Sequence, residues 1–542
     1  MKKNIQDILI LVIKDALKNL SFPEEEPLLD IPQDSRFGDF STNIALKLSK
    51  SVKKNPRDAA ISLIEAIKST LGQHAAADLV KDIKVEGPGF INFYLSDKYY
   101  HDELKNIIKD GSFAVKADSG KVKKVLIEFV SANPTGSLSV AHARQAAVGD
   151  VLANILDFLG FQVSREYYLN DEGNQINILG NSVELRMKEL AGEKIEFPEN
   201  YYQGDYIYDI AKVVPTQKPK DESIGDFAAN YILNIIRKEL DDFGVKFDCW
   251  YSQKELGRSG KIEQALDFLK NKGYIYEQDG AVWLKSTEFG DDKDRVVRKS
   301  DGAYTYLAPD IAYHQEKYKR GFEWLINLWG PDHHGYINRL KASVAAFGKD
   351  PESLSVIIVQ LATIFRDGKP VHMSTRKGQY ITLREVLDEV GKDASRFFFL
   401  MRRTSSHLDF DLDVAKQQTS DNPVYYVQYA HARICSILRS SGIKLDDKID
   451  FSLLKEKEEL DLIKKLLQVS YILNICLETR DPYMLTVYLQ ELAREFHKFY
   501  DLHRVLGDNE ALTKARLSLI EGVKIIFTLG FDLLGVSKPE KM

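Results

Sequence analysis

The sequence predicts a multidomain α/β fold: a Rossmann-type parallel-sheet domain in the middle, an α+β domain before it and an all-α helical bundle after it. Three observations predict this, the first being that 542 residues are too many for one hydrophobic core. The second is that the middle of the chain alternates strand and helix patterns, and the third is that only helical periodicity remains after about residue 421. We expect domains at 1–115, 116–420 and 421–542, with insertions over about 180–290.

Composition and charge restrict the class of protein. Hydrophobic residues make up 44% of the chain and charged residues 28%, which is ordinary for a globular protein and excludes a disordered one. The longest aliphatic run, Ile8 to Ile13, is far shorter than the roughly 20 residues needed to cross a membrane. Three separated cysteines without a CxxC pair favour a reducing cytoplasm. The net charge of −6 means that any nucleic acid must bind at local patches.

The first 115 residues combine helical and strand patterns. Apolar residues from Ile8 to Leu17 follow a helical spacing, which predicts an N-terminal helix. Gly87-Pro88-Gly89 breaks the chain before an alternating run over 90–94, which predicts a strand. The polar, Lys-rich stretch 110–124 is typical of a linker, so we place the first domain boundary there.

The middle domain is predicted to begin with a strand at Val125–Val130, an apolar β-rich run of the kind that parallel sheets bury on both faces. A helix over about 139–159 and a strand at 161–165 complete a βαβ unit. The pattern repeats with a strand at 324–329 and a helix to 347, and a further strand is expected over 355–364. Because parallel strands end at one edge, where open sheets bind ligands, we expect the loops after these strands to form one site.

Two loops at this predicted edge suit a phosphate. Asn133 to His142 leads into a helix N-terminus, whose free N–H groups and positive dipole attract anions. The stretch 366–378 carries four basic residues among glycines, as expected of a loop that closes over a polyphosphate. A single His or one charge run is more often structural, so it is the convergence of both loops that favours a site. Phosphate-loop, GxGxxG and GxSxG motifs are absent from the sequence, which disfavours P-loop ATPases, nicotinamide dehydrogenases and α/β-hydrolases.

Several segments, in order along the chain, resemble one family. Residues 133–142 resemble the HIGH signature of class I aminoacyl-tRNA synthetases, and 372–378 resemble their KMSKS loop. The specific resemblance is to arginyl-tRNA synthetases, and it extends over nearly the whole chain, through 35–40, 87–93, 167–175, 310–314, 422–433, 533–536 and 539–542. It implies ATP-dependent activation of L-arginine and transfer to tRNA, with Mg²⁺ accompanying ATP and no dedicated metal site on the protein.

The resemblance also implies which residues form the sites. His142, Arg376 and Lys377 would be catalytic, and ATP would contact Gly136, Ser139, Ala141, His142, Asp332, His333, Met373 and Ser374. Arginine would contact Asn133, Gln253, Tyr306 and Asp310, since a planar, permanently charged guanidinium needs carboxylate and aromatic partners. Unpaired tRNA bases would stack on Tyr425, Tyr426 and Tyr429, with Arg433 beside them.

These residues also have ordinary structural explanations. By residue type alone, Tyr306 and Asp310 could form an exposed helix face, and His333 could belong to a metal site. The three C-terminal tyrosines could simply be core. The resemblance, not the residue types, decides between these alternatives.

The sequence departs from the family pattern at four positions. Ser139 and Ala141 replace the first His and the Gly of the HIGH signature, His372 replaces the first Lys of the KMSKS loop, and Gln253 replaces a Glu. Three hypotheses therefore stay open: an arginine–tRNA ligase, a catalytically weakened tRNA-binding or regulatory protein, and a class I ligase for another amino acid. The first is the leading one, and we expect it to act as a cytoplasmic monomer without membrane association.

Overall fold

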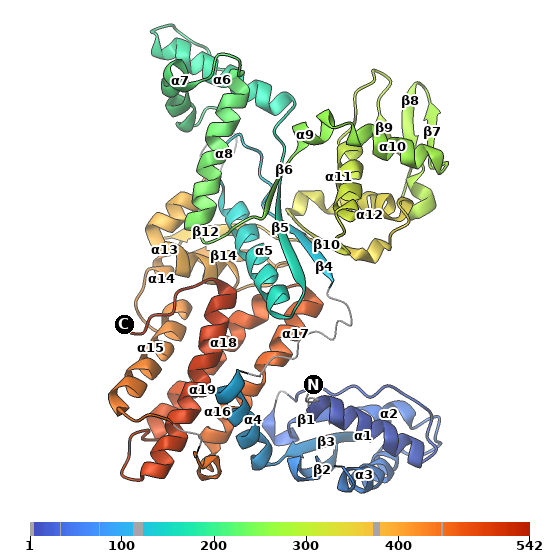
Figure 1. Ribbon diagram of the computed structural model, residues 1–542, viewed down its shortest axis with the longest axis vertical. Helices are drawn as coiled ribbons and strands as arrows, with labels where there is room; N and C mark the ends of the chain where they lie inside the picture. The colour runs from blue at the N-terminus through green and yellow to red at the C-terminus, as the bar shows by residue number, and fades with distance from the viewer. Residues whose placement is uncertain (1–4, 33, 75, 112–122, 372–379, 446–447) are drawn as a thin grey trace.

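The computed structural model describes all residues except 1–4, 33, 75, 112–122, 372–379 and 446–447. A parallel sheet lies at the centre, and the N-terminal domain lies beside the C-terminal helices at one end of the molecule (Figure 1). The predicted fold class is confirmed: a mixed N-terminal domain, a parallel-sheet domain and an all-α C-terminal region. Most of the predicted linker at 110–124 lies outside the described residues.

The N-terminal domain is a three-stranded antiparallel sheet packed against helices. Helix α3 begins where the Asn55 side chain accepts the N–H of Arg57, with Pro56 in the first turn, which is a favoured helix start. The predicted N-terminal helix and the strand after Gly89 are confirmed. The elements are α1 (Ile5–Asn19), β1 (Phe40–Thr42), α2 (Ile44–Leu48), α3 (Pro56–Gly72), β2 (Val80–Glu86), β3 (Phe90–Leu95) and α4 (Asp97–Asp110).

The central domain is built on a five-stranded sheet in which all strands are parallel. In spatial order the strands are β11 (Leu354–Ile358), β10 (Trp324–Trp329), β4 (Lys124–Glu128), β5 (Gln162–Leu169) and β6 (Cys249–Ser252). The chain order reverses between β4 and β10, and connections leave in opposite directions from such a point, which opens a crevice at the carboxyl ends. Helix α5 (Val140–Phe158) follows β4 and is buried along most of its length. The predicted strands near 125, 161 and 324 and the helix over 139–159 are confirmed.

The single strand predicted over 355–364 is wrong, because this stretch forms two strands in different sheets. Strand β11 ends at Ile358, and the carbonyls of Gln360 and Leu361 accept hydrogen bonds from the buried Arg144 guanidinium instead of continuing the ladder. The loop after Ile364 therefore does not leave the parallel sheet. The second sheet has the order β13 (Lys369–Pro370), β12 (Ala362–Arg366) and β14 (Leu408–Asp411).

Two groups of elements extend from the central domain, away from the N-terminal domain (Figure 1). One lies between β5 and β6, and the other between β6 and β10. Because β6 pairs with β5, the stretch 180–290 contains the edge strand of the parallel sheet as well as inserted elements. These elements and the flanking helices are α6 (Asn174–Leu190), α7 (Tyr206–Gln217), α8 (Ile224–Asp242), α9 (Gln253–Arg258), α10 (Lys261–Asn271), β7 (Ile275–Gln278), β8 (Ala281–Leu284), β9 (Arg295–Arg298), α11 (Leu307–Lys319) and α12 (Ile337–Ala346).

The C-terminal region is helical, as predicted. The apolar stripe from Leu485 to Phe499 on α18 is fully buried. The bundle is fixed to the central domain by Arg396, which donates to the carbonyl of Leu534 at 2.6 Å and to the carboxylate of Asp150 on α5 at 2.6 Å. Within the described ranges, no helix is both long and apolar enough to cross a bilayer. The helices α13 (Leu383–Phe399) and α14 (Leu412–Ala415) precede this region, and its own helices are α15 (Pro423–Ser441), α16 (Lys457–Leu467), α17 (Val469–Thr479), α18 (Tyr483–Leu502) and α19 (Glu510–Leu534).

Candidate functional site

The turn between β4 and α5 holds the first predicted motif. Ser139 caps α5, and its backbone N–H donates to Nδ1 of His142 at 3.2 Å. Burial lowers the pKa of His142 to about 4, so the imidazole is neutral at pH 7. Since Nδ1 accepts a hydrogen bond, the proton of the neutral ring is on Nε2, which can donate to an anionic ligand.

The backbone of this turn is strained where the strand ends. Val130 and Ser131 have φ angles of 68° and 40°, which non-glycine residues, and β-branched ones in particular, rarely adopt. The Ser131 hydroxyl donates to the Glu128 carboxylate at 3.2 Å and accepts the backbone N–H of Tyr168 at 3.1 Å. Strain of this kind is typical of functional sites, where the surrounding structure holds it in place.

The residues that follow the second motif are bound to the first motif. The N–H of Leu383 donates to the carbonyl of Leu138 at 2.8 Å, and Ser139 forms an isolated antiparallel bridge with Thr382. The first motif therefore lies beside the residues that follow the second motif, although the single strand predicted over 355–364 is two strands in different sheets. The residues predicted from the second motif, His372, Met373, Ser374, Arg376 and Lys377, lie outside the described residues, and their roles stay predictions.

Asp310 lies in the first turn of α11, and its carboxylate accepts a hydrogen bond from the Tyr336 hydroxyl at 2.6 Å. Burial, with a further contribution from the Glu128 carboxylate, raises the pKa of Asp310 to about 7. Tyr306, one turn earlier, is 83% exposed. The two residues thus lie at the same helix end but in different environments, Asp310 partly buried and Tyr306 at the surface.

Sequence reasoning missed Glu128, the last residue of β4. Its carboxylate accepts a hydrogen bond from Nζ of the fully buried Lys317 at 2.5 Å. The same carboxylate lies close enough to Asp310 to raise the pKa of Asp310. A signal was present, because a carboxylate within an otherwise apolar parallel strand must be paired or functional.

Asn133 and Gln253 contact one segment, the part of 167–175 that follows β5. The Asn133 amide donates to the Gln175 side chain at 2.7 Å, and the Gln253 amide donates to Glu172 at 3.2 Å. Gln253 also accepts the Tyr168 hydroxyl at 3.1 Å. These contacts gather predicted residues at the carboxyl ends of three neighbouring strands.

Asp332 and His333 follow β10 in a short 3₁₀ turn, Pro331–Tyr336. Their side chains are 81% and 60% exposed, and the Asp332 carboxylate lies 3.7 Å from Nε2 of His333. In the part of the chain that the structure describes, no group of three or more His, Cys, Asp or Glu side chains could hold a metal ion. The pair lies at the end of the strand next to β4.

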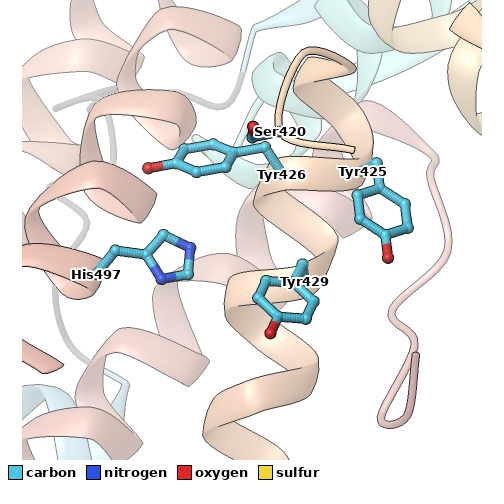
Figure 2. Close-up of a pocket in the computed structure, with 5 residues that line it drawn as sticks. All are labelled: Ser420, Tyr425, Tyr426, Tyr429 and His497. Atoms are coloured by element: carbon cyan, nitrogen blue, oxygen red, sulfur yellow. The ribbon is translucent and has the colours of Figure 1, made fainter. Parts of the chain in front are cut away.

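The four aromatic and basic residues predicted on α15 also lie together. Tyr425, Tyr426 and Tyr429 line a pocket of about 420 Å³ with Ser420 and His497, and Figure 2 shows His497 approaching from a second helix. The rings of Tyr426 and His497 have centroids 5.0 Å apart. The tyrosines are half-buried and line this pocket, so they are not simply core.

Arg433 completes this surface. Its guanidinium lies 4.8 Å from the centroid of the Tyr429 ring and donates to the hydroxyl of the same residue at 2.5 Å. Sequence reasoning missed His497, whose neighbour Phe496 belongs to the apolar stripe of α18. Nothing in the spacing distinguishes this His from a residue at the edge of the stripe.

Comparison with known proteins then identifies the family. Three family models match in order: the arginyl tRNA synthetase N terminal domain over 7–95, the tRNA synthetases class I (R) catalytic domain over 103–435, and the DALR anticodon binding domain over 427–542. The arginine–tRNA ligase of Geobacter sp. strain M21 is 48% identical to this chain over 96% of each chain. The chain belongs to the arginyl-tRNA synthetase family. The resemblance that the motifs indicated is thereby confirmed.

Further relatives agree with this assignment. The arginine–tRNA ligase of Listeria monocytogenes serovar 1/2a is 47% identical over 95% of this chain and 94% of that protein. The solved Thermus thermophilus arginyl-tRNA synthetase has a TM-score of 0.79, with 99% of this chain and 100% of that chain covered, at 23% identity. That structure therefore shares the fold. As in other members of the arginyl-tRNA synthetase family, the class I catalytic domain of this chain implies the use of ATP.

Proposed function

We propose that this chain ligates L-arginine to tRNA at the carboxyl edge of the parallel sheet. The carboxylate of arginine attacks the α-phosphate of ATP, which forms arginyl-adenylate and releases pyrophosphate. A ribose hydroxyl at the 3′ end of tRNA then attacks the arginyl carbonyl, and AMP leaves. The observation that carries the proposal is that His142, a neutral donor, and the carboxylates of Asp310 and Glu128 all lie at the carboxyl edge of the sheet, in a chain of the arginyl-tRNA synthetase family. No observation favours the catalytically weakened or differently specific alternative.

The His142 end of the site suits ATP. The Nε2–H of His142 and the N-terminus of α5 offer donors to phosphate oxygens, and Arg376 and Lys377 would add charge as the transition state forms. The other residues proposed to contact ATP are Gly136, Ser139, Ala141, Asp332, His333, Met373 and Ser374. Mg²⁺ would enter with the phosphates of ATP.

The Asp310 end suits the guanidinium of arginine. Lys317 balances the charge of Glu128, so Asp310 supplies the remaining negative charge for a cationic substrate. The hydroxyls of Tyr168 and Tyr336 lie beside this carboxylate. Asn133 would hold the amino-acid backbone, and Gln253 and Tyr306 would also contact arginine.

The α15 pocket suits unpaired tRNA bases. Half-buried aromatic rings with an adjacent guanidinium provide stacking surfaces and a phosphate contact. We propose that the anticodon loop binds Tyr425, Tyr426, Tyr429 and Arg433. Deleting 421–542 would uncover α5, which packs against α17 and α19, so a point variant such as Tyr426→Ala tests this role more cleanly.

The chain is further proposed to work as a monomer in the cytoplasm. Its three cysteines are unpaired, which supports a reducing compartment. Light scattering coupled to size exclusion, with and without tRNA, tests the monomer. A mass of two chains for the tRNA-free protein would contradict it.

Arginine-dependent exchange between ATP and pyrophosphate, measured with tRNA present and with a panel of amino acids, tests the function. Exchange is expected with arginine alone, and little is expected without tRNA, as is general for this family. No exchange with any amino acid would support the tRNA-binding alternative instead. Exchange with a different amino acid would identify another ligase.

A further inference from the structure

Two tyrosine hydroxyls hold the turn that precedes α5. The Tyr206 hydroxyl donates to the carbonyl of Thr135 at 2.6 Å, and the Tyr380 hydroxyl donates to the carbonyl of Ser137 at 2.9 Å. Gly136 lies between these carbonyls, and a Cβ there would lie 3.3 Å from the Tyr380 hydroxyl and 3.4 Å from that of Tyr206. The two tyrosine hydroxyls therefore bond the turn on both sides of Gly136, its one glycine.

We propose that Tyr206 and Tyr380 are positioning residues for adenylation, and that they act by fixing the turn that carries Ser139 and His142. This inference rests on the proposed binding of ATP at that turn. It assigns a role in the active site to α7, an inserted helix that begins 37 residues after the end of β5 (206 − 169). Neither tyrosine belongs to a predicted motif.

Local structure directs Tyr206 toward the turn. A Cβ at Gly204 would lie 2.5 Å from the Tyr206 ring, so only glycine leaves room for the ring in this orientation. Helix α7 packs against α6 and α8, which hold it to the central domain. Packing of α7 against α6 and α8 thus fixes the backbone of Tyr206, and its hydroxyl donates to the Thr135 carbonyl.

Tyr380 contacts the turn from a different segment, the one that pairs with the turn through its backbone. It precedes Ile381, whose carbonyl accepts a hydrogen bond from the N–H of Val140 at 3.3 Å. The N–H of Leu383 in turn donates to the carbonyl of Leu138 at 2.8 Å. The hydroxyl therefore adds a side-chain contact to a backbone pairing that already fixes the end of the turn. Together the two tyrosines restrain both sides of Gly136, a residue that otherwise has wide conformational freedom.

This arrangement predicts which kinetic constant changes when one of these hydroxyls is removed. A turn free to move around Gly136 holds the donors of His142 and of the α5 N-terminus in productive geometry for less of the time. The loss should fall on kcat/KM for ATP, while the KM for arginine and the affinity for tRNA stay within about twofold, because the Asp310 carboxylate is held by the Tyr336 hydroxyl and the α15 pocket is lined by other residues.

The test uses Tyr206→Phe, Tyr380→Phe and the double variant in the full-length chain, with Tyr208→Phe as the matched control. Tyr208 is also on α7, but its hydroxyl bonds Glu189 at 2.8 Å, away from the turn. In pyrophosphate exchange with tRNA, each single variant is expected to lose about five- to tenfold in kcat/KM for ATP, consistent with one lost hydrogen bond. The double variant is expected to lose about 30- to 100-fold, and the control less than twofold.

Active-site titration separates positioning from stability, since a merely structural role would lower the active fraction and leave the KM for ATP of the remaining enzyme unchanged. Gly136→Ala adds a second test. It should slow the parent enzyme, whose hydroxyls crowd the new methyl, more than it slows the double Phe variant. Normal kcat/KM for ATP in both single variants and the double variant, or losses equal to the loss of active enzyme, would overturn the proposal.

His142→Ala distinguishes this failure from that of the proposed site. If His142→Ala abolishes exchange while the Phe variants are normal, only the role of the tyrosines is wrong. If His142→Ala also leaves exchange intact, the binding of ATP at this turn is wrong.

Discussion

The two βα turns on either side of the switch point have the same topology but opposite environments. The turn after β4 is paired with residues 381–383, strained at Val130 and held by side-chain hydrogen bonds from Tyr206 and Tyr380. The turn after β10 contains no buried residue and exposes Asp332 and His333. The first turn is therefore preorganised by the fold, whereas the Asp332 and His333 side chains of the second turn lie largely in solvent. A motif at a sheet edge predicts where a ligand binds, but not how firmly the site is held.

Arg144 accounts for much of this difference. It lies in the second turn of α5 with no exposed surface, and it donates to the carbonyls of Gln360, Ser406 and Arg403 at 2.8, 2.9 and 3.0 Å. Burial lowers its pKa to about 10, which still leaves the guanidinium charged at pH 7. The helix that carries His142 is thus fixed by backbone carbonyls of two loops.

The largest effect is expected from Arg144→Met. Removing this fully buried guanidinium leaves several backbone carbonyls without their donor, so the free energy of unfolding should fall by about 3–5 kcal/mol. Arg339→Met is the control from α12, the helix after the second turn, because the Arg339 guanidinium lies over the Tyr336 ring at 4.7 Å and its loss should cost about 1 kcal/mol or less. Urea unfolding followed by tryptophan fluorescence measures both. Equal losses would remove the proposed difference between the two turns.

The next largest effect is on chemistry. His142→Ala removes a fixed donor from the preorganised turn, so single-turnover adenylate formation should slow by about 10²- to 10³-fold. His333→Ala removes an exposed side chain and should slow it by about tenfold or less. Both variants should keep parental tRNA affinity. A greater loss in His333→Ala would reverse the roles of the two turns.

The third prediction concerns pH and the Asp310 carboxylate. Burial raises the pKa of Asp310 to about 7, so below pH 7 most of this carboxyl group is protonated. It must then lose its proton before it can pair with a guanidinium. The KM for arginine should therefore fall about tenfold from pH 6 to pH 8 and level off above it. Asp310→Asn should raise the KM for arginine and remove this dependence. A flat profile in the parent chain would mean that Asp310 does not bind the substrate cation.

Sequence patterns predicted most of the fold and placed several candidate residues at one sheet edge, and the misses have physical causes. Apolar periodicity is local, so α5 and the stripe on α18 were predictable. The break after Ile358 was not, because its cause, Arg144, is distant in sequence and reaches those carbonyls only in the folded chain. Tyr206 was missed for the same reason, and His497 was missed because its spacing matches the edge of the apolar stripe on α18. Glu128 was predictable in principle, since its charge interrupts an apolar strand.

The smallest effect expected is a gain in the preorganised turn. Ser139→His with Ala141→Gly restores the family signature and adds an imidazole donor near the phosphates, so adenylation should quicken. The backbone N–H of residue 139 still bonds Nδ1 of His142, so the tautomer of His142 is kept. The gain is reduced because the Ser139 cap is lost and a glycine enters the first helical turn, each costing about 1 kcal/mol of stability.

We therefore expect about a fivefold faster single-turnover rate, well below the 10²-fold that a donor can contribute. The two single variants separate the causes: Ser139→His alone should carry the gain, and Ala141→Gly alone should change the rate by less than twofold. If the double variant is slower than the parent, the turn is already optimised around Ser139, and the fixed geometry held by Arg144, Tyr206 and Tyr380 matters more than the number of imidazoles.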